Sequence, residues 1–309
     1  MKEIIKLKPV FKDYIWGGQF LKKHFCVEDM DLVAEAWTVS VHPDGCSLAD
    51  GGEYDGKSFS EIVELIGVDG LGENAKAFDR FPQLIKFIDA KGSLSVQVHP
   101  SDEYALQYEG QFGKTEMWYI MEAEEGAGIY YGVKKEITPE EFEERIKNNT
   151  LTDVLNFIEV KKGETYFIPS GTIHAIGAGL LIAEIQQNSN ATYRIYDFGR
   201  LGADGKPREL HIEKAKAVSS LVPPLSDNVV SASNTENRRI AECKYFKVDE
   251  INIKGEYELL YRDSFAAVTI VEGGGEINGQ SFCELDTFFV PAGKKALLKG
   301  NFKALISTV

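Results

Sequence analysis

Four side chains on β-like segments give this sequence its clearest chemistry. The segment SLSVQVHP carries Gln97 and His99, GKTEMWYI carries Glu116, and ETYFIPSGTIHAI carries His174. Imidazole, carboxylate and amide groups all donate lone pairs to divalent ions. The four side chains therefore form a candidate metal site, in which zinc would keep an open position for water or substrate. The oxygen donors leave manganese, iron and cobalt open as alternatives.

Strand periodicity predicts how the first two of these residues face a common space. Residues two apart on a strand point to the same side, so Gln97 and His99 share one face. That polar face also carries Ser93 and Ser95, and the opposite face carries Leu94, Val96 and Val98. A strand with one polar face suits a ligand-holding β-barrel. A structural interpretation stays open for each residue taken alone, because His-Pro also ends strands as simple turn chemistry, as in VHPDG at 41–45.

The composition excludes several classes of function. A formal net charge of −14 opposes general nucleic-acid binding, which needs clustered lysine and arginine. The four cysteines are scattered without a CxxC pair, which favours reduced thiols over disulfides or a zinc finger. The N-terminal MKEIIKLKPVFKDYIWGG lacks the apolar stretch of a signal peptide, and no segment approaches the length of a membrane span. We expect a cytoplasmic protein without nucleic-acid or membrane partners.

The pattern along the chain predicts a mainly β fold with a few short helices. Apolar segments such as PQLIKFIDA, GAGIYYGV and TYFIPSG recur between glycines, which is typical of antiparallel strands. Helical patterns are confined to residues 58–66, 102–108, 138–148 and 210–219. A sandwich-like barrel is the economical interpretation. At 309 residues the chain exceeds one typical domain.

A composition change near residue 220 predicts a domain boundary. Residues 219–239 are rich in serine, asparagine and proline and show no sustained period, which indicates a linker. We predict an N-terminal catalytic domain over 1–220, a linker over 221–239 and a second β domain over 240–309.

An internal repeat supports this division. The segment YFIPSG at 166–171 aligns with FFVPAG at 288–293, so the same barrel motif occurs twice. In the continued register His174 falls opposite Ala296, and the alignment of WYIME with VTIVE sets Glu116 opposite Ala266. The second copy therefore lacks metal ligands, and we expect it to be packing support or a lid for the first.

Taken together, the QxH strand, the following KxE, the PSGxxHA segment and NSNATYRIYDFGR resemble type I mannose-6-phosphate isomerases, zinc enzymes of the cupin superfamily. The resemblance spans roughly the first 200 residues and extends less specifically to the end. It implies two cupin-like (jelly-roll) β-barrels and one zinc ion per chain, held by Gln97, His99, Glu116 and His174. The chain departs from the family in a reduced helical insertion and in Gly113, where larger members often have histidine.

The resemblance also implies an activity and the residues that carry it. The family interconverts mannose 6-phosphate and fructose 6-phosphate through an enediol, so a phosphorylated hexose is the expected partner. Arg194 matches the family's pocket arginine, and Lys86, Lys114 and Glu184 match pocket positions. Arg194 would grip substrate oxygens or stabilise the enediolate, and Lys86 or Lys114 would bind phosphate or assist proton transfer.

Glu184 is the first candidate for the general base. In LLIAEIQQ it shares one strand face with Ile182 and Gln186, so its carboxylate is placed to enter the polar pocket. An equally supported alternative is that Glu184 orients Arg194 or a ligand histidine through a hydrogen bond.

Two other functions compete with the isomerase. An iron-dependent cupin oxygenase would favour more histidines or a His-x-His arrangement, whereas this chain has Gln97 before His99. A non-catalytic sugar-phosphate-binding or regulatory protein would keep the pocket without turnover. Among the remaining candidates, Tyr14, Trp16 and Trp37 are interpreted as packing rather than as sugar platforms.

Overall fold

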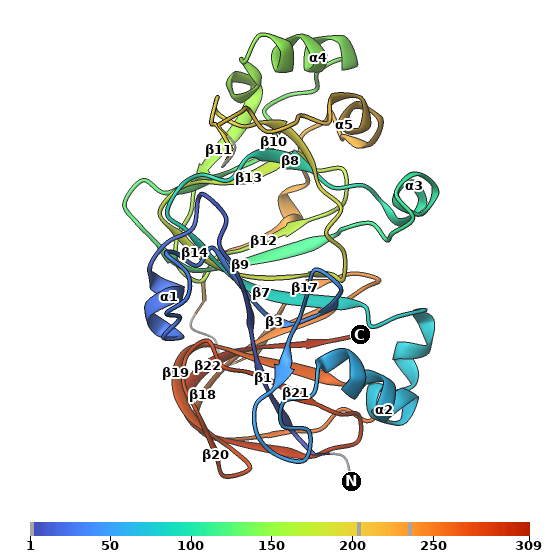
Figure 1. Cartoon of the computed structure of the whole chain (residues 1–309), viewed down its shortest axis with the longest axis vertical. Helices are drawn as coiled ribbons and strands as arrows, with labels where there is room; N and C mark the ends of the chain where they lie inside the picture. Colours follow the sequence, from blue (N-terminus) through green and yellow to red (C-terminus); the bar gives the residue numbers. More distant parts are fainter. Residues whose placement is uncertain (1–2, 203–204, 234–236) are drawn as a thin grey trace.

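The computed structural model describes residues 3–202, 205–233 and 237–309 and is built mainly of β-strands (Figure 1). Two halves stack along the long axis, with the later strands of the chain forming the lower half in this view. The prediction of a mainly β fold with few short helices is confirmed. No helix of the described residues has the length and apolar character of a bilayer-crossing segment.

Two antiparallel sheets form the upper half of the molecule. The seven-stranded sheet runs, in order, through β16 (Val229–Val230), β12 (Thr165–Ile168), β9 (Glu116–Ala123), β14 (Leu180–Gln187), β7 (Gln83–Ala90), β3 (Glu35–Val39) and β2 (Val10–Lys12). The five-stranded sheet runs through β11 (Leu155–Glu159), β10 (Gly128–Val133), β13 (His174–Ile176), β8 (Val96–Val98) and β15 (Tyr193–Tyr196). The candidate ligands come from both sheets.

One larger sheet forms most of the lower half. It runs through β17 (Asn237–Glu242), β18 (Lys247–Leu259), β22 (Ala296–Thr308), β19 (Ala266–Ile277), β21 (Thr287–Val290), β1 (Ile5–Lys8) and β6 (Leu48–Ala49), and β20 (Gln280–Phe282) pairs with β19. Two of its strands thus come from the first fifty residues of the chain. A separate hairpin joins β4 (Val41–His42) to β5 (Gly45–Cys46).

The domain boundaries stay a prediction, but the proposed linker contains regular structure. Within 221–239, β16 pairs with β12 of the upper half, and β17 begins at Asn237. A short 3-10 helix, η3 (Ser226–Asn228), precedes β16. Residues 234–236 of this segment lie outside the described residues.

Side chains along β9 point alternately into the upper barrel, where the candidate site lies, and toward the lower half of the molecule. Trp118 and Ile120 pack in the core enclosed by the two upper sheets. Met117, Tyr119 and Met121 point the other way, into a core shared with the lower half. Because side chains alternate with a period of two, the residue that precedes Met117 faces the upper barrel. That residue is the candidate ligand Glu116.

The internal repeat is confirmed by strand register. In the upper half Ile168 of β12 pairs with Glu116 of β9, and in the lower half Val290 of β21 pairs with Ala266 of β19. His174 begins β13, just as Ala296 begins β22. The two halves therefore repeat one strand arrangement, and alanines occupy the two ligand positions in the second copy.

Five α-helices lie outside the sheets: α1 (Phe20–His24), α2 (Phe59–Leu71), α3 (Asp102–Tyr108), α4 (Pro139–Lys147) and α5 (Ile212–Val218). These are the α-helices of the described residues, and two further 3-10 segments are η1 (Glu73–Ala77) and η2 (Leu151–Val154). The four predicted helices are present, whereas α1 was not predicted. Its first two free amides, those of Phe20 and Leu21, donate to Asp89 on β7, a distant partner that a local pattern does not show.

We expect Ser58→Ala to lower the free energy of unfolding by about 1 kcal/mol. Ser58 and Glu61 form a reciprocal capping box at the start of α2, which satisfies two backbone amides that the helix leaves free. Urea unfolding would measure the loss, with Ser60→Ala in the same helix as the control. An equal effect of both substitutions would contradict the cap assignment.

Candidate metal centre and active site

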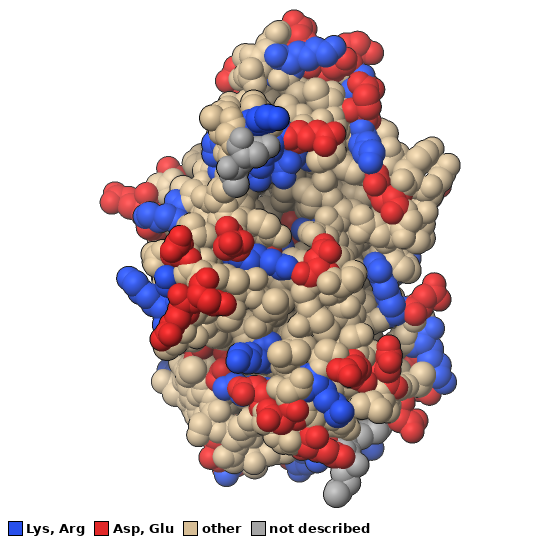
Figure 2. Space-filling view, viewed as in Figure 1, with Lys and Arg blue, Asp and Glu red and all other residues tan. Residues whose placement is uncertain are grey.

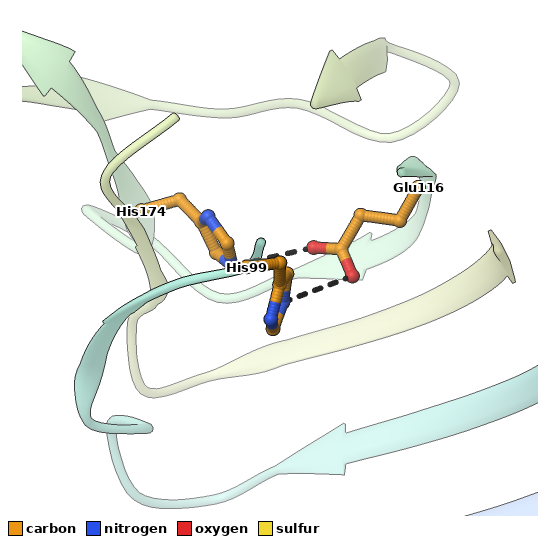
Figure 3. A group of neighbouring side chains, drawn as sticks. All are labelled: His99, Glu116 and His174. Atoms are coloured by element: carbon orange, nitrogen blue, oxygen red, sulfur yellow. Dashed lines mark ion pairs between the residues drawn. The ribbon is translucent and has the colours of Figure 1, made fainter. Parts of the chain in front are cut away.

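Three buried side chains from different strands converge at one point of the upper barrel. His99 follows β8, Glu116 begins β9 and His174 begins β13. His99 Nε2 lies 3.4 Å from Glu116 Oε2, and His174 Nε2 lies 3.3 Å from Glu116 Oε1. Figure 3 shows both imidazoles turned toward the carboxylate. The atoms that could bind an ion all lie within 4.8 Å of one another.

Backbone carbonyls fix the tautomer of both histidines. His99 Nδ1 lies 2.9 Å from the Ala191 carbonyl oxygen, and His174 Nδ1 lies 2.8 Å from that of Thr172. A carbonyl only accepts hydrogen bonds, so Nδ1 carries the proton and donates, which leaves the Nε2 lone pair toward Glu116. Burial and then the Lys114 charge lower the pKa of His99 to about 3, and burial lowers the pKa of His174. Both rings are therefore neutral near pH 7, as metal ligands must be.

Gln97 completes the group predicted from the sequence. It pairs in register with His174 across β8 and β13, and its Nε2 atom lies 3.4 Å from His174 Nε2. Val96 and Val98 on the other face pack against the helices in a separate core, as the strand pattern predicts. The placement of Leu94 on that face was wrong, because β8 begins only at Val96 and Leu94 packs inside the barrel.

The chemistry of this group fits a divalent cation. Glu116 Oε1 is buried, and no donor among the described residues forms a hydrogen bond with it. Burial alone would raise the pKa of Glu116, but Lys114 and the two histidines outweigh burial and hold the pKa well below its usual range. An ionised, partly unsatisfied carboxylate beside two imidazole lone pairs is a suitable ligand set for such an ion.

Lys114 links the histidine–carboxylate group to a second carboxylate. Its Nζ atom donates to Glu116 Oε2 at 2.5 Å and lies 3.1 Å from His99 Nε2. The same ammonium lies 3.4 Å from Glu184 Oε1. Lys114 is therefore in contact with both the candidate metal ligands and the candidate base.

Glu184 lies in a row of side chains that crosses the seven-stranded sheet. Strand register pairs Trp37 with Lys86, Lys86 with Glu184, and Glu184 with Trp118. Lys86 Nζ lies 3.3 Å from Glu184 Oε1, and Trp118 Nε1 donates to Glu184 Oε2 at 3.0 Å. A neighbouring strand thus fixes Oε2 by a hydrogen bond, whereas the buried Oε1 lies beside ammonium groups without a hydrogen-bond donor among the described residues.

The pKa values of Glu184 and Lys86 are both raised, which suits a proton transfer at Glu184. Burial, followed by the charge of Glu116, raises the pKa of Glu184 even though Lys114 and Lys86 partly offset both effects. Burial would lower the pKa of Lys86, but the charges of Glu184 and Glu35 outweigh it and raise the pKa. Lys86 therefore stays cationic beside a carboxylate whose pKa is displaced toward neutrality.

A cavity of about 310 Å³ opens beside these groups. Gln97, Lys114 and Glu184 line its inner part, and Arg194 lines it from β15, where it pairs in register with Gln97. Figure 2 shows a hollow in the upper half of the molecule with basic side chains gathered along its upper edge. The volume lies at the lower end of the range for small-molecule sites.

Arg194 is held only in part by the protein. Its Nη1 atom donates to the Glu209 carbonyl at 3.1 Å, whereas its buried Nε has no acceptor among the described residues. Burial and then the nearby charge of Arg208 lower the pKa of Arg194. Two neighbouring guanidinium groups with incomplete compensation favour an anion in this part of the cavity.

Two charged residues of the cavity were not among the predicted site residues. Glu35 is buried, and its Oε2 atom lies 3.4 Å from Lys86 Nζ. The same oxygen accepts a hydrogen bond from Trp37 Nε1 at 2.6 Å. Arg208 is held by Asp197 through two charged hydrogen bonds. The alternation in AEAWTV contained the signal for Glu35, because it puts Glu35 on the same strand face as Trp37. For Arg208 there was no comparable local signal.

The aromatic residues divide between two roles. Trp37 is fully buried, as its interpretation as packing predicts. Tyr14 and Trp16 instead line the cavity, with their rings 5.7 Å apart between centroids. Trp16 also packs in the core enclosed by the two upper sheets, as its interpretation as packing predicts, whereas Tyr14 is exposed.

Comparison with known proteins shows the family of this chain. The family described as phosphomannose isomerase type I, catalytic domain, matches residues 4–127. The mannose-6-phosphate isomerase ManA of Bacillus subtilis (strain 168) is 38% identical over 99% of this chain and 98% of its own. The chain belongs to the type I phosphomannose isomerase family. The mannose-6-phosphate isomerase of Streptococcus mutans is 37% identical over 90% of this chain and 87% of its own.

Solved structures extend the family relationship to the whole fold. The crystal structure of the mannose 6-phosphate isomerase from Bacillus subtilis matches this chain with a TM-score of 0.89 at 35% identity, covering 100% of both chains. The phosphomannose isomerase fold therefore includes the lower half of the molecule as well as the residues of the site.

Proposed function

We propose that this chain is a divalent-metal-dependent aldose–ketose isomerase that interconverts mannose 6-phosphate and fructose 6-phosphate. The observation that carries the proposal is the contact of Lys114 with both the His99–Glu116–His174 group and Glu184. Lys114 thus joins the candidate ion site to a cavity that is lined by a carboxylate suited to proton transfer and by two arginines. The names of the relatives in Bacillus subtilis and Streptococcus mutans support this substrate pair.

The metal we propose is one zinc ion per chain, held by Gln97, His99, Glu116 and His174. Two imidazoles with one carboxylate are a common zinc ligand set, and zinc does not change oxidation state. When bound, such an ion polarises a substrate oxygen and stabilises the negative charge that develops during enolisation. The chain's part is to keep both imidazoles neutral and oriented through the carbonyls of Ala191 and Thr172.

Glu184 is the proposed general base. In the open-chain sugar it would take the proton from C2 and return it to C1, while the hydroxyl proton of O2 passes to O1 through the enediol, so that no net proton is gained or lost. Its raised pKa suits both steps, because the carboxylate must bind the proton and then release it. Lys86 stays cationic beside it and would stabilise the ionised form between steps.

Arg194 and Arg208 are the proposed partners of the substrate phosphate. Both line the cavity, and Arg194 belongs to the five-stranded sheet whereas Glu184 belongs to the seven-stranded sheet. Guanidinium groups bind phosphate oxygens through paired hydrogen bonds. Asp197 would hold Arg208 in place during binding. This arrangement predicts that mannose without the phosphate is a much poorer substrate.

The proposal also covers the roles of the two domains and the cellular compartment. We infer a catalytic upper domain and a lower domain that supports it without ligands of its own, since alanines occupy the two ligand positions. The four cysteines, all described, form no disulfide, which supports a reducing compartment such as the cytoplasm.

We expect chelation to abolish the interconversion and zinc to restore it. The purified protein would be assayed with both sugar phosphates, and with unphosphorylated mannose, before chelation, after chelation and after each divalent ion is added back. Restored turnover with manganese or cobalt alone would overturn the choice of zinc. Binding of the sugar phosphate without turnover under any metal would instead support a non-catalytic binding protein.

A further inference from the structure

A chain of hydrogen bonds joins the lower half of the molecule to the segment that carries Lys114 and Glu116. Tyr245, in the turn between β17 and β18, donates its hydroxyl to Asp102 Oδ2 at 2.6 Å. Gln187 Nε2 donates to Asp102 Oδ1 at 2.9 Å. The other side-chain atom of Gln187, Oε1, accepts from the backbone N–H of Thr115 at 2.8 Å.

This segment lies directly on the first turn of α3. The backbone N–H of Gly113 donates to Asp102 Oδ1 at 2.9 Å, and that of Lys114 donates to the Pro100 carbonyl at 3.0 Å. A Cβ atom at Gly113 would lie only 2.4 Å from the backbone nitrogen of Asp102. The closeness of the two backbones explains why glycine precedes the lysine in this chain.

The position of Gln187 makes it the centre of this arrangement. It ends β14, the strand that carries Glu184, and its own backbone N–H donates to the Thr115 carbonyl at 3.0 Å. Gln187 and Thr115 are both buried, so neither the amide of Thr115 nor the Gln187 side chain has water as an easy substitute partner. Gln187 therefore ties the strand of the candidate base to the residue between Lys114 and Glu116.

We infer that Asp102, Gln187 and Tyr245 are positioning residues, by which the lower domain fixes Lys114 and Glu116 against Glu184. The inference rests on the proposed function, because it assigns a purpose to the geometry of that site. Lys114 contacts Glu116 and Glu184 at 2.5 and 3.4 Å, and small displacements of such groups can lower rates strongly. None of the three residues lines the cavity or belongs to the candidate ligand group, so they act through the segment 113–116.

Two substitutions test this inference. Gln187→Leu removes the acceptor of the Thr115 amide, and Tyr245→Phe removes only the hydroxyl bound to Asp102. For Gln187→Leu we expect about a 10–100-fold loss in zinc affinity, measured by competition with a chromogenic chelator, and a fall in kcat of similar size. KM should change by less than about threefold, because the arginines are untouched. Tyr245→Phe should act in the same direction with a smaller effect.

Matched variants separate positioning from general destabilisation. Tyr119→Phe also removes a tyrosine hydroxyl from a carboxylate of the lower domain, Glu250, but on the opposite face of β9. It should lower the melting temperature while zinc affinity and kcat stay within about twofold of the original chain. Asp102→Asn can keep the two hydrogen bonds that Oδ1 accepts and can donate from its amide nitrogen to the Tyr245 hydroxyl, so it should retain zinc affinity, whereas Asp102→Ala should not.

The outcomes distinguish this inference from the proposed function. Zinc affinity and kcat unchanged in Gln187→Leu and Tyr245→Phe, with an active unmodified chain, would overturn the positioning role. Equal losses in Tyr119→Phe would also overturn it, since the effect would then belong to domain contact in general. An unmodified chain without isomerase activity would refute the proposed function, while the zinc affinities would still test the positioning of Glu116.

Discussion

Glu184→Gln is expected to lower kcat by about 10²–10⁴-fold while the protein keeps its bound metal. Glutamine preserves the shape of the side chain and can still meet Trp118 Nε1, but an amide cannot take a proton from carbon. The measurement is the rate of mannose 6-phosphate conversion at saturating substrate, together with the metal content of the same preparation. Nearly intact turnover with unchanged metal would refute the base role and leave Glu184 as an orienting residue.

The pH dependence of kcat gives an independent check on the same residue. A base acts only when ionised, so kcat should fall as the pH drops through the pKa of Glu184. Burial and then the charge of Glu116 raise this pKa, so the fall should occur above the usual range of a glutamate. The residual kcat of Glu184→Gln should not show this fall at low pH. Glu35→Gln, which changes the other carboxylate beside Lys86, should retain it.

The sequence predicted site residues best where they lie on strands, because side chains two residues apart share one face. Gln97 and His99 were placed together because residues two apart share a face, and the structure brings both beside His174. The same rule put Glu184 on an inward face, where it now contacts Lys86 and Lys114. The repeat of YFIPSG also predicted which half would lack ligands, and strand register confirms the alignment.

The alternation of side chains along one strand does not predict contacts between segments that are distant in the sequence. The alternation in AEAWTV puts Glu35 on the strand face of Trp37, but it does not indicate that Glu35 would lie beside Lys86, because β3 and β7 become neighbours only in the folded sheet. The same holds for β1, which precedes the strands of the upper half and pairs with β21 near the end of the chain. The limit is physical, since such pairings depend on how whole sheets bury their faces rather than on local propensity.

Gly113 shows how a departure from a family pattern gains meaning from the fold. In the sequence Gly113 is only a difference from larger family members, which often have histidine at this position. In the structure it allows the backbone of this segment to lie against α3, a contact that a side chain at this position would block. The substitution is therefore part of how this chain positions its lysine.

Glu116→Gln is expected to produce the largest loss of metal. The amide carries no negative charge, so zinc affinity should fall by more than about 100-fold, beyond the effect expected of residues that only support a ligand. Turnover should fall in parallel and recover in part at high zinc concentration. Equilibrium dialysis and zinc titration of the rate would measure both quantities, and normal zinc affinity would exclude Glu116 as a ligand.

The same substitution should also change how the stability of the metal-free protein depends on pH. Lys114 and the histidines hold the pKa of Glu116 below its unfolded value, so its charge stabilises the fold above that unfolded value. This contribution disappears as the pH falls through the folded pKa. The metal-free Glu116→Gln protein should therefore be less stable near pH 7, by up to about 3–5 kcal/mol, because a buried ion pair is broken. The difference should shrink in acid.

Glu250→Gln is the control, because it alters a buried carboxylate that is paired with Arg238 away from the site. It should lose stability without losing zinc affinity. A loss of zinc affinity in both variants would mean that the metal responds to general destabilisation rather than to the missing ligand.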